Sequence, residues 1–555
     1  MAVIRLAGFL GESRAQHPTL VPDGMGVASR NQKPGRGDLR AWMQPLTVAT
    51  VPAGRRSIYR LGRDVASDSL YWLSWTSSPV HAVRGFDPAD TTERTYFSGD
   101  GAPKVTDNTS LDGTDPQDNP AATRPMGLPA PTGAPSVSTV AGGTSTELQT
   151  VYYVYTYVND WGWESAPSPV SASNTRKLDA SATVSGFTAA PAGNYNINRR
   201  RIYRTATGSS GATDFFFLRE IAIGTSSITD ANEVLGELLP TTGWLPAPGV
   251  PIGGASGGSE GNLSHLTAMW NGMLAGISAN RVRLCEPYLA YAWPDDYDIV
   301  PPDGKPVGLG VFGQRLLVLT TGRPLLLQGS TPDSMDQTPL EIPQGCVSAR
   351  SVVSMGAGVA WASEDGLCWF GTDGARILTD GLMTRKDWQA LVPSSIVGRL
   401  YEGMYFGSYS TDGGVTRQGF MLSPGAKSGI YFLDSGYEGL HFDELMDQLY
   451  VLDGTLVRKW DAGATSLTYR FRSKAFRAPR PVNFACAEVL ADAYPVTFRV
   501  WGDGVLRHTQ TVTGSGVFRL PAGFMALDWQ FEIEGTGAVQ SAAIATSVGE
   551  LAAVA

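Results

Sequence analysis

Short apolar runs broken by turn residues recur along almost the whole chain. Runs such as LTVATV, SLYWLSW and VYYVYTYV are rich in aromatic and β-branched residues, and Pro, Gly or Asp bounds them. Tyr153, Tyr155 and Tyr157 stand at alternate positions, which places their side chains on one face of a strand. Apolar residues at helical spacing are scarce. The pattern predicts an all-β fold of many short strands joined by tight turns.

A loose repeat runs through residues 265–465. Its units begin with NGMLAGIS, FGQRLLVLT, MGAGVAWAS, YEGMYFGSY and DQLYVLDG, at residues 271, 312, 355, 401 and 447. The spacing of about 41 to 46 residues matches one four-stranded blade of a β-propeller. Asp-Gly pairs, which supply the positive φ angles of hairpin turns, recur between the expected strands. We predict a degenerate β-propeller-like body and leave the number of blades open.

Two polar segments rich in Pro and Gly, at about 107–135 and 246–262, read as flexible linkers. Between them, the strand order is typical of a fibronectin type III or immunoglobulin-like sandwich, which we expect to fold independently as an inserted domain. The predicted parts are an extended N-terminal arm at 1–45, the first part of the propeller-like body at 46–125, the inserted fibronectin III/immunoglobulin-like domain at 136–248, the main part of the body at 262–465, and a C-terminal β-sandwich at 467–555. The arm carries few apolar residues, so we expect it to need another subunit or an adaptor protein to become ordered.

The composition supports several domains without a membrane anchor. A chain of 555 residues is too long for one hydrophobic core, and its charged fraction of 17% is below the usual quarter. The net charge is −9, and the Lys and Arg residues are scattered, which argues against a basic nucleic-acid groove. No run approaches the roughly 20 apolar residues of a membrane span, and the N-terminal apolar run is too short for a signal peptide. We expect a soluble protein made in a cytoplasm.

Candidate ligand residues are few. Cys285, Cys346, Cys368 and Cys486 form no CxxC pair, so we expect buried free thiols instead of a zinc site. The five His residues have no metal-binding spacing. The one basic cluster, Arg199 to Arg201, lies in a strand-like segment, where we interpret it as a solvated strand face. We therefore predict no cofactor and no cofactor-binding or metal residues.

Catalytic candidates are equally weak. The paired carboxylates Asp295 and Asp296 follow Pro294 in what reads as a solvated loop, and adjacent strand residues would point to opposite faces. SEDGLCW (363–369) approaches the Asp-box of sialidase-type propellers, which is a turn motif and not a catalytic one. Single arginines occur in several repeat units, but at no consistent blade position: Arg281, Arg283, Arg315, Arg323, Arg350 and Arg376. We predict no catalytic residues and no enzyme activity.

Several stretches taken together resemble a known family. They are GDLRAW (37–42), TYFSGDGAPKVTDN (95–108), NGMLAGISANRVRLCEPYLAYAWP (271–294), GLGVFGQRLLVLTTGRPLLLQGS (308–330) and CVSARSVVSMGAGVAWASEDGLCWFGTDGARILT (346–379). These stretches resemble tailed-phage virion structural proteins of the tail nozzle, or tail tubular protein B, type. The similarity covers residues 1–125 and 260–550, and the insert looks like the optional immunoglobulin-like modules of phage structural proteins.

The resemblance implies a structural role in the virion. It implies a homohexameric ring in the phage tail below the portal and adaptor proteins, assembled in the host cytoplasm, with tail fibres among its expected contacts. DNA would pass through the ring during ejection without sequence-specific binding, and an acidic wall would let the duplex slide where a basic wall would hold it. Two alternatives stay open: a receptor- or carbohydrate-binding tail protein that contacts the host surface, and a secreted propeller hydrolase.

We expect the pure protein to hydrolyse neither sialosides, polysaccharides nor peptidoglycan, because its sequence offers no convergent nucleophile, acid and base. Turnover assays with these three substrate classes test this expectation. Activity that one point substitution abolishes would contradict it.

Overall fold

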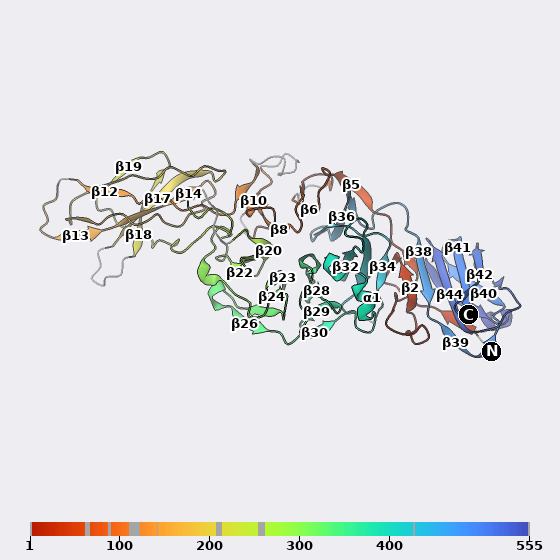
Figure 1. Ribbon diagram of the computed structural model, residues 1–555. Coiled ribbons are helices and arrows are strands. Elements are labelled where there is room, and N and C mark those ends of the chain that lie inside the picture. Colours follow the sequence, from red (N-terminus) through yellow and green to blue (C-terminus); the bar gives the residue numbers. More distant parts are fainter. Residues whose placement is uncertain are drawn as a thin grey trace. The chain divides into compact units, whose positions relative to one another are not determined.

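The described residues confirm an all-β fold. The computed structural model describes residues 3–61, 67–86, 90–109, 122–140, 142–206, 214–253, 261–425 and 428–552 (Figure 1). Within these ranges the only α-helices are the short α1 (Arg385–Gln389) and α2 (Val548–Ala552). The chain divides into two compact units: residues 1–76, 319–324 and 340–555 form the first, and residues 77–318 and 325–339 form the second.

Each of the five repeat units lies in a sheet meander of its own, as in a propeller blade. The successive strands are β20 (Ser264–Ala268), β21 (Leu274–Ser278) and β22 (Arg281–Leu284); β23 (Pro306–Phe312), β24 (Arg315–Thr320), β25 (Leu325–Gln328) and β26 (Asp336–Pro339); β27 (Val353–Ser354), β28 (Gly358–Ala362), β29 (Leu367–Gly371) and β30 (Gly374–Ile377); β31 (Val397–Tyr401), β32 (Met404–Tyr409), β33 (Gln418–Leu422) and β34 (Tyr431–Leu433); and β35 (Gly439–Asp443), β36 (Gln448–Asp453) and β37 (Leu456–Lys459). The repeated motif begins at the turn before the second strand, where Asn271, Glu402 and Asp447 adopt positive φ. The repeat therefore marks one hairpin per sheet.

The strands before the insert are divided between the two units. They are β5 (Leu46–Thr50), β6 (Ser57–Arg60), β7 (Trp72–Trp75), β8 (His81–Arg84), β9 (Thr95–Ser98), β10 (Lys104–Thr106) and β11 (Arg124–Pro125). β8 to β11 form a four-stranded sheet, and β6 pairs with β7. β5 pairs antiparallel with β37 and so completes the sheet of the last repeat. One sheet therefore joins the first strand of the body to the last.

The N-terminal segment is ordered by its own chain, and the expectation that it needs another subunit is wrong. β1 (Val3–Leu6) pairs with β45 (Val539–Ala545), and β2 (Gly26–Arg30) pairs antiparallel with β38 (Tyr469–Ser473) and parallel with β34. The short β3 (Gln32–Lys33) and β4 (Arg40–Ala41) pair with each other. Leu39 and Trp42 are both fully buried. The C-terminal strands therefore supply the pairing partners that we expected another subunit or an adaptor protein to provide.

The predicted C-terminal sandwich is present, and the N-terminus completes it. One sheet has the order β1-β45-β40-β43, and the other joins β38, β44, β41 and β42, with β39 beside β44. The remaining bounds are β39 (Phe476–Val482), β40 (Cys486–Ala491), β41 (Val496–Gly502), β42 (Val505–Val512), β43 (Phe518–Arg519) and β44 (Ala526–Gly535). Phe471, Phe498, Trp529, Phe531 and Ile544 lie in the core between the sheets. Since β2 bridges β34 and β38, a ten-stranded sheet runs from the β31–β34 blade into the sandwich (Figure 1).

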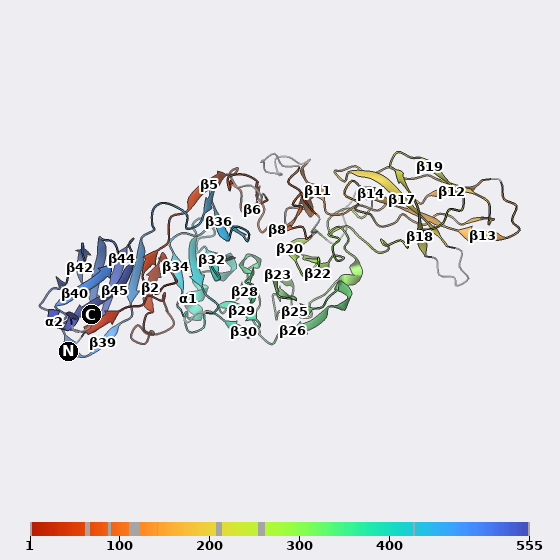
Figure 2. The same ribbon diagram turned by 180° about the vertical axis from the view of Figure 1, so that it is seen from behind.

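The insert is a sandwich of three small sheets, β12-β16-β19, β13-β15 and β14-β17-β18 (Figure 2). The strands are β12 (Ser136–Thr139), β13 (Leu148–Val151), β14 (Tyr153–Asn159), β15 (Asn174–Lys177), β16 (Ala182–Ser185), β17 (Ile197–Thr205), β18 (Phe215–Ala222) and β19 (Ser227–Asp230). Tyr153, Tyr155 and Tyr157 lie together in its core with Val184 and Ile202, which confirms their predicted common face.

A serine ladder covers the outer edge of β14. The serines of the segment SAPSPVS stand three residues apart. Each of them contacts one of the β14 tyrosines, which stand two residues apart. The backbone N–H of Ser165 donates to the carbonyl oxygen of Tyr157 at 2.9 Å, and the Tyr157 N–H donates back to Ser165 Oγ at 2.9 Å. Ser168 and Ser171 repeat both bonds with Tyr155 and Tyr153. The serine oxygens thus satisfy donors of an edge strand, which would otherwise invite pairing with another chain.

The connectors of the insert are packed, so their interpretation as flexible linkers is wrong for the residues that the structure describes. Met126, Leu128 and Val250 are buried against the sheets beside the insert. The backbone N–H of Ala247 donates to the carbonyl oxygen of Met126 at 3.0 Å, so the entering and leaving chains lie side by side. The rest of the expected linkers, residues 110–121 and 254–260, lies outside the described residues.

We expect Leu39→Ala to lower the free energy of unfolding by about 2–5 kcal/mol, because it leaves a cavity where the N-terminal segment meets the sandwich core. Leu20→Ala is the matched control, since Leu20 belongs to the same segment but is 71% exposed, and should cost under about 0.5 kcal/mol. Urea unfolding of both variants measures the difference. Equal stabilities would show that the segment is not part of the core.

Candidate functional site

The sequence-derived catalytic candidates do not form a site. Asp295 and Asp296 start a single exposed 3₁₀ turn, η2 (Asp295–Tyr297), and the Asp295 carboxylate accepts a hydrogen bond from Arg283 Nη1 at 2.8 Å. SEDGLCW forms the turn between β28 and β29, where the Ser363 N–H donates to the Gly366 carbonyl oxygen at 2.9 Å. The carboxylates face solvent, and the Asp-box-like segment stabilises a hairpin.

The four cysteines are buried free thiols, as predicted. Burial raises the pKa of Cys285, Cys346 and Cys368 to about 12, so these thiols stay protonated at neutral pH. In the part of the chain that the structure describes, no three His, Cys, Asp or Glu side chains come together as metal ligands.

The cluster Arg199 to Arg201 is not a solvated strand face. The Arg200 side chain is buried and donates to the carbonyl oxygens of Thr188 and Ile223 at 2.8 and 2.5 Å. Arg199 and Arg201 point to the other face of β17, where both pair with Glu220 at 2.9 Å. Strand alternation places Arg200 on one face of β17 and Arg199 and Arg201 on the other, and each guanidinium group finds its hydrogen-bond partners within the insert.

The insert also buries a charge network around Asp230, in which two arginines share one carboxylate. The Asp230 carboxylate accepts hydrogen bonds from Arg176 Nη2 at 2.8 Å, Arg204 Nη1 at 2.6 Å and the Tyr153 hydroxyl at 2.5 Å. Asp230 and the Arg176 side chain are fully buried. Burial acts to raise the pKa of Asp230, but these hydrogen bonds lower it below its usual value. The hydrogen bonds of this network hold strands of the insert together, because their donors all bind one carboxylate acceptor.

A different arginine cluster gathers around residues 436–440, the segment that leads into β35. β35 lies in contact with β31 and β6. The cluster takes one arginine from each of four segments: Arg56 before β6, Arg350 in the 3₁₀ turn η4 (Ala349–Ser351), Arg399 in β31 and Arg417 before β33. Only Arg350 was among the arginines singled out in the sequence.

Glu438 binds two of these arginines. Its carboxylate oxygen Oε1 accepts hydrogen bonds from Arg56 Nη2 at 2.5 Å and Arg350 Nη1 at 2.9 Å, and its backbone carbonyl accepts one from Arg350 Nη2 at 2.6 Å. Burial acts to raise the pKa of Glu438, but the two guanidinium groups hold it below its usual value. Glu438 is therefore an anion that ties η4 to the segment before β6.

Arg399 and Arg417 bind neutral oxygens instead. Arg399 Nε donates to the Leu440 carbonyl at 3.1 Å and Nη1 to its neighbour Gly398 at 2.9 Å. Arg417 donates to the carbonyls of Ser395 and Ser408 at 2.6 and 3.0 Å. Burial, together with the charge of Arg350, lowers the pKa of both guanidinium groups to about 10. Both remain cationic at neutral pH, and the cluster as a whole is positive.

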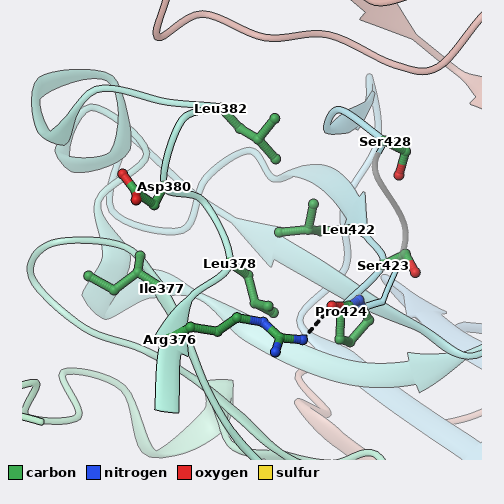
Figure 3. A pocket seen from close by; sticks show the side chains of 9 residues that line it. All are labelled: Arg376, Ile377, Leu378, Asp380, Leu382, Leu422, Ser423, Pro424 and Ser428. Carbon is green, nitrogen blue, oxygen red and sulfur yellow. Dashed lines mark hydrogen bonds between the residues drawn. The ribbon is translucent and has the colours of Figure 1, made fainter. Parts of the chain in front are cut away.

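A hollow of about 520 Å³ lies elsewhere in the same unit, between the segment after β30 and the loop after β33 (Figure 3). Leu378, Leu382 and Leu422 form its apolar walls. Arg376 reaches across it and donates to the Pro424 carbonyl at 2.7 Å, while it also pairs with Asp373. Its charge is already engaged, so the hollow offers an apolar surface and no evident chemistry.

Comparison with known proteins gives no family. No protein-family model matches the chain, and no curated protein matches it. Among solved structures, the chain is similar to the extracellular domain of a hybrid two component system from B. thetaiotaomicron, at 8% identity and TM-score 0.29 over 91% of this chain and 60% of that chain. It is also similar to AztD from Citrobacter koseri, at 12% identity and TM-score 0.25 over 67% and 99% of the two chains, and to PorZ from Porphyromonas gingivalis, at 10% identity and TM-score 0.23 over 90% and 82%. Such low TM-scores carry no argument about function.

Two histidine rings in the second unit pack against each other in a tilted arrangement. The rings of His81 in β8 and His265 in β20 lie 4.9 Å apart. His265 Nδ1 lies 3.1 Å from Ser264 Oγ, and burial lowers the pKa of His265 to about 4. The backbone of His265 has a φ of 55°, in the left-handed region that Asn adopts more readily than most residues. His265 is therefore held neutral at physiological pH.

We expect stability to fall as the pH drops from about 6.5 towards 4. In that window the unfolded chain takes up a proton on His265 that the folded chain does not, which is worth about 3 kcal/mol for the full shift. His265→Asn should flatten this part of the pH dependence, whereas His17→Asn, at an exposed position, should not. Unfolding midpoints at pH 7, 5.5 and 4 measure it. Parallel curves for wild type and His265→Asn would contradict the assignment.

Proposed function

We propose that this protein is a structural component of a bacteriophage tail, the nozzle ring below the portal and adaptor proteins that forms part of the DNA ejection channel. The proposal rests on the resemblance of five sequence stretches to tail nozzle proteins and on the place of one stretch in the fold. GDLRAW contains β4 and ends at Trp42, whose ring lies 5.9 Å from Trp460 and 6.0 Å from Tyr401. The motif therefore lies where the N-terminal segment packs against the β31–β34 and β35–β37 sheets.

A further structural observation that supports the proposal is the ten-stranded sheet that β2 makes continuous. A wall that guides DNA under pressure needs subunits whose parts do not slide over each other. β2 pairs with β38 at four residue pairs and with β34 at Arg30 and Phe432, so backbone pairing on both sides of β2 joins the blade to the C-terminal sandwich. Such a joint suits a scaffold better than it suits an enzyme that opens and closes.

A negatively charged channel wall would let DNA pass without retention. The net charge is −9, and a repelling wall reduces the counterion release that holds proteins on DNA. We propose six copies in a closed ring, with adaptor and portal-proximal tail proteins as neighbours, assembled in the host cytoplasm. Because the N-terminal segment is ordered within its own chain, its surface, and not its folding, would make any contact with the adaptor.

The experiment is an image of virions that contain this chain. We expect six copies around the tail axis below the adaptor, and particles lacking the chain should package DNA but leave their tails incomplete. A mass measurement on the isolated protein is a weaker test, because tail proteins of this kind often stay monomeric until the particle offers a docking surface. A peripheral three-fold fibre would contradict the nozzle proposal and favour a receptor- or carbohydrate-binding tail protein.

A further inference from the structure

The arginine cluster around residues 436–440 has more positive charge than its contacts balance. It brings together four guanidinium groups, and the one carboxylate bonded to them is Glu438. Within the described residues, Arg399 and Arg417 form no ion pair, and their hydrogen bonds go to carbonyl and hydroxyl oxygens. Carbonyl oxygens satisfy N–H groups but do not neutralise a charge. The cluster therefore keeps roughly three uncompensated positive charges.

Several other buried arginines of the same chain have a carboxylate partner, although Arg200 also binds carbonyl oxygens alone. The buried side chain of Arg283 pairs with Asp298 at 2.5 Å, and Arg176 and Arg204 share Asp230. In each of those places a carboxylate offsets the cost of taking a guanidinium out of water. Arg399 and Arg417 are half-buried beside Arg350 without such a partner. An arrangement of that kind is costly unless an anion completes it.

We propose that Arg350, Arg399 and Arg417 form a binding site for a small phosphate-type oxyanion. The guanidinium fork donates two parallel N–H bonds to such oxyanions, which is why arginine is preferred over lysine for phosphate. Neutral carbonyl and hydroxyl contacts hold Arg399 and Arg417 in place without neutralising their charge, and Glu438 holds Arg350, so the three side chains are positioned before the anion arrives. The partly enclosed position of Arg399 favours a free phosphate or a phosphate monoester over a duplex backbone.

The site is independent of the nozzle proposal, because it depends only on residues within the first unit. A phosphate bound there would link η4, β31 and the segment before β33 through charge-assisted bonds. It would stabilise the folded chain by mass action. This effect separates the two proposals, since phosphate can bind whether or not the chain assembles into a tail.

Isothermal titration of the full chain with inorganic phosphate, at fixed ionic strength in chloride, tests the site. We expect one phosphate per chain and at least a tenfold weaker affinity for Arg399→Gln. Arg385→Gln is the matched control, because Arg385 is 65% exposed, pairs with Asp365 and lies outside the cluster. Parallel titrations with a nucleoside monophosphate and with acetate separate a free phosphate from a phosphate monoester and from a carboxylate.

A second variant keeps the test decisive if Arg399→Gln does not fold. Glu438→Gln removes the one carboxylate and leaves all four arginines, so phosphate should bind several-fold more tightly. If the wild type does not bind phosphate at 10 mM, roughly the weakest affinity of use here, the proposal is overturned. Equal affinity in Arg399→Gln and Arg385→Gln, or acetate binding as tightly as phosphate, overturns it as well.

Discussion

The first unit depends on one strand, β2, which supplies hydrogen bonds to two sheets at once. Without it, β34 of the blade and β38 of the sandwich would each present an edge of unpaired N–H and C=O groups. Edge strands of that kind recruit other chains. Because β2 comes from the N-terminus and β38 from the C-terminal sandwich, the chain must bring segments more than 400 residues apart together before either sheet is complete. Leu39 and Trp42 then follow β2 into cores whose other members come mostly from residues 397–544.

The insert solves the same edge problem with side chains. Its serine ladder covers β14 with hydroxyl oxygens at three-residue spacing, in a proline-containing segment that cannot form an ordinary strand. The insert is also held by packed connectors, and Trp163 stacks on Tyr291 at 5.1 Å. A domain that looks detachable along the sequence is therefore anchored through its own aromatic residues.

Buried charge is treated in two ways in this chain. Around Asp230, a tyrosine and two arginines surround one carboxylate, and both arginines bind it directly. Around residues 436–440, Glu438 binds two of the four arginines, and the other two bind backbone carbonyls. The first arrangement fixes a fold. The second holds charge in a defined geometry without using it, which is what a binding site requires.

The sequence alone determined the strand content, the repeat, the shared face of the three tyrosines and the buried free thiols. Each of these depends on local spacing or on hydrophobicity, which are visible in the chain itself. Tertiary structure decided what depends on partners distant in sequence. The N-terminal segment looked unable to order itself because its partner strands lie some 440 to 540 residues later, in β38 and β45. The Arg199–Arg201 stretch looked solvated because its acceptors, Glu220 and the carbonyls of Thr188 and Ile223, come from other segments. Arg56, Arg399 and Arg417 carried no signal of their own, since a single arginine in a strand is ordinary, and only the packing of β6, β31 and β35 makes them neighbours.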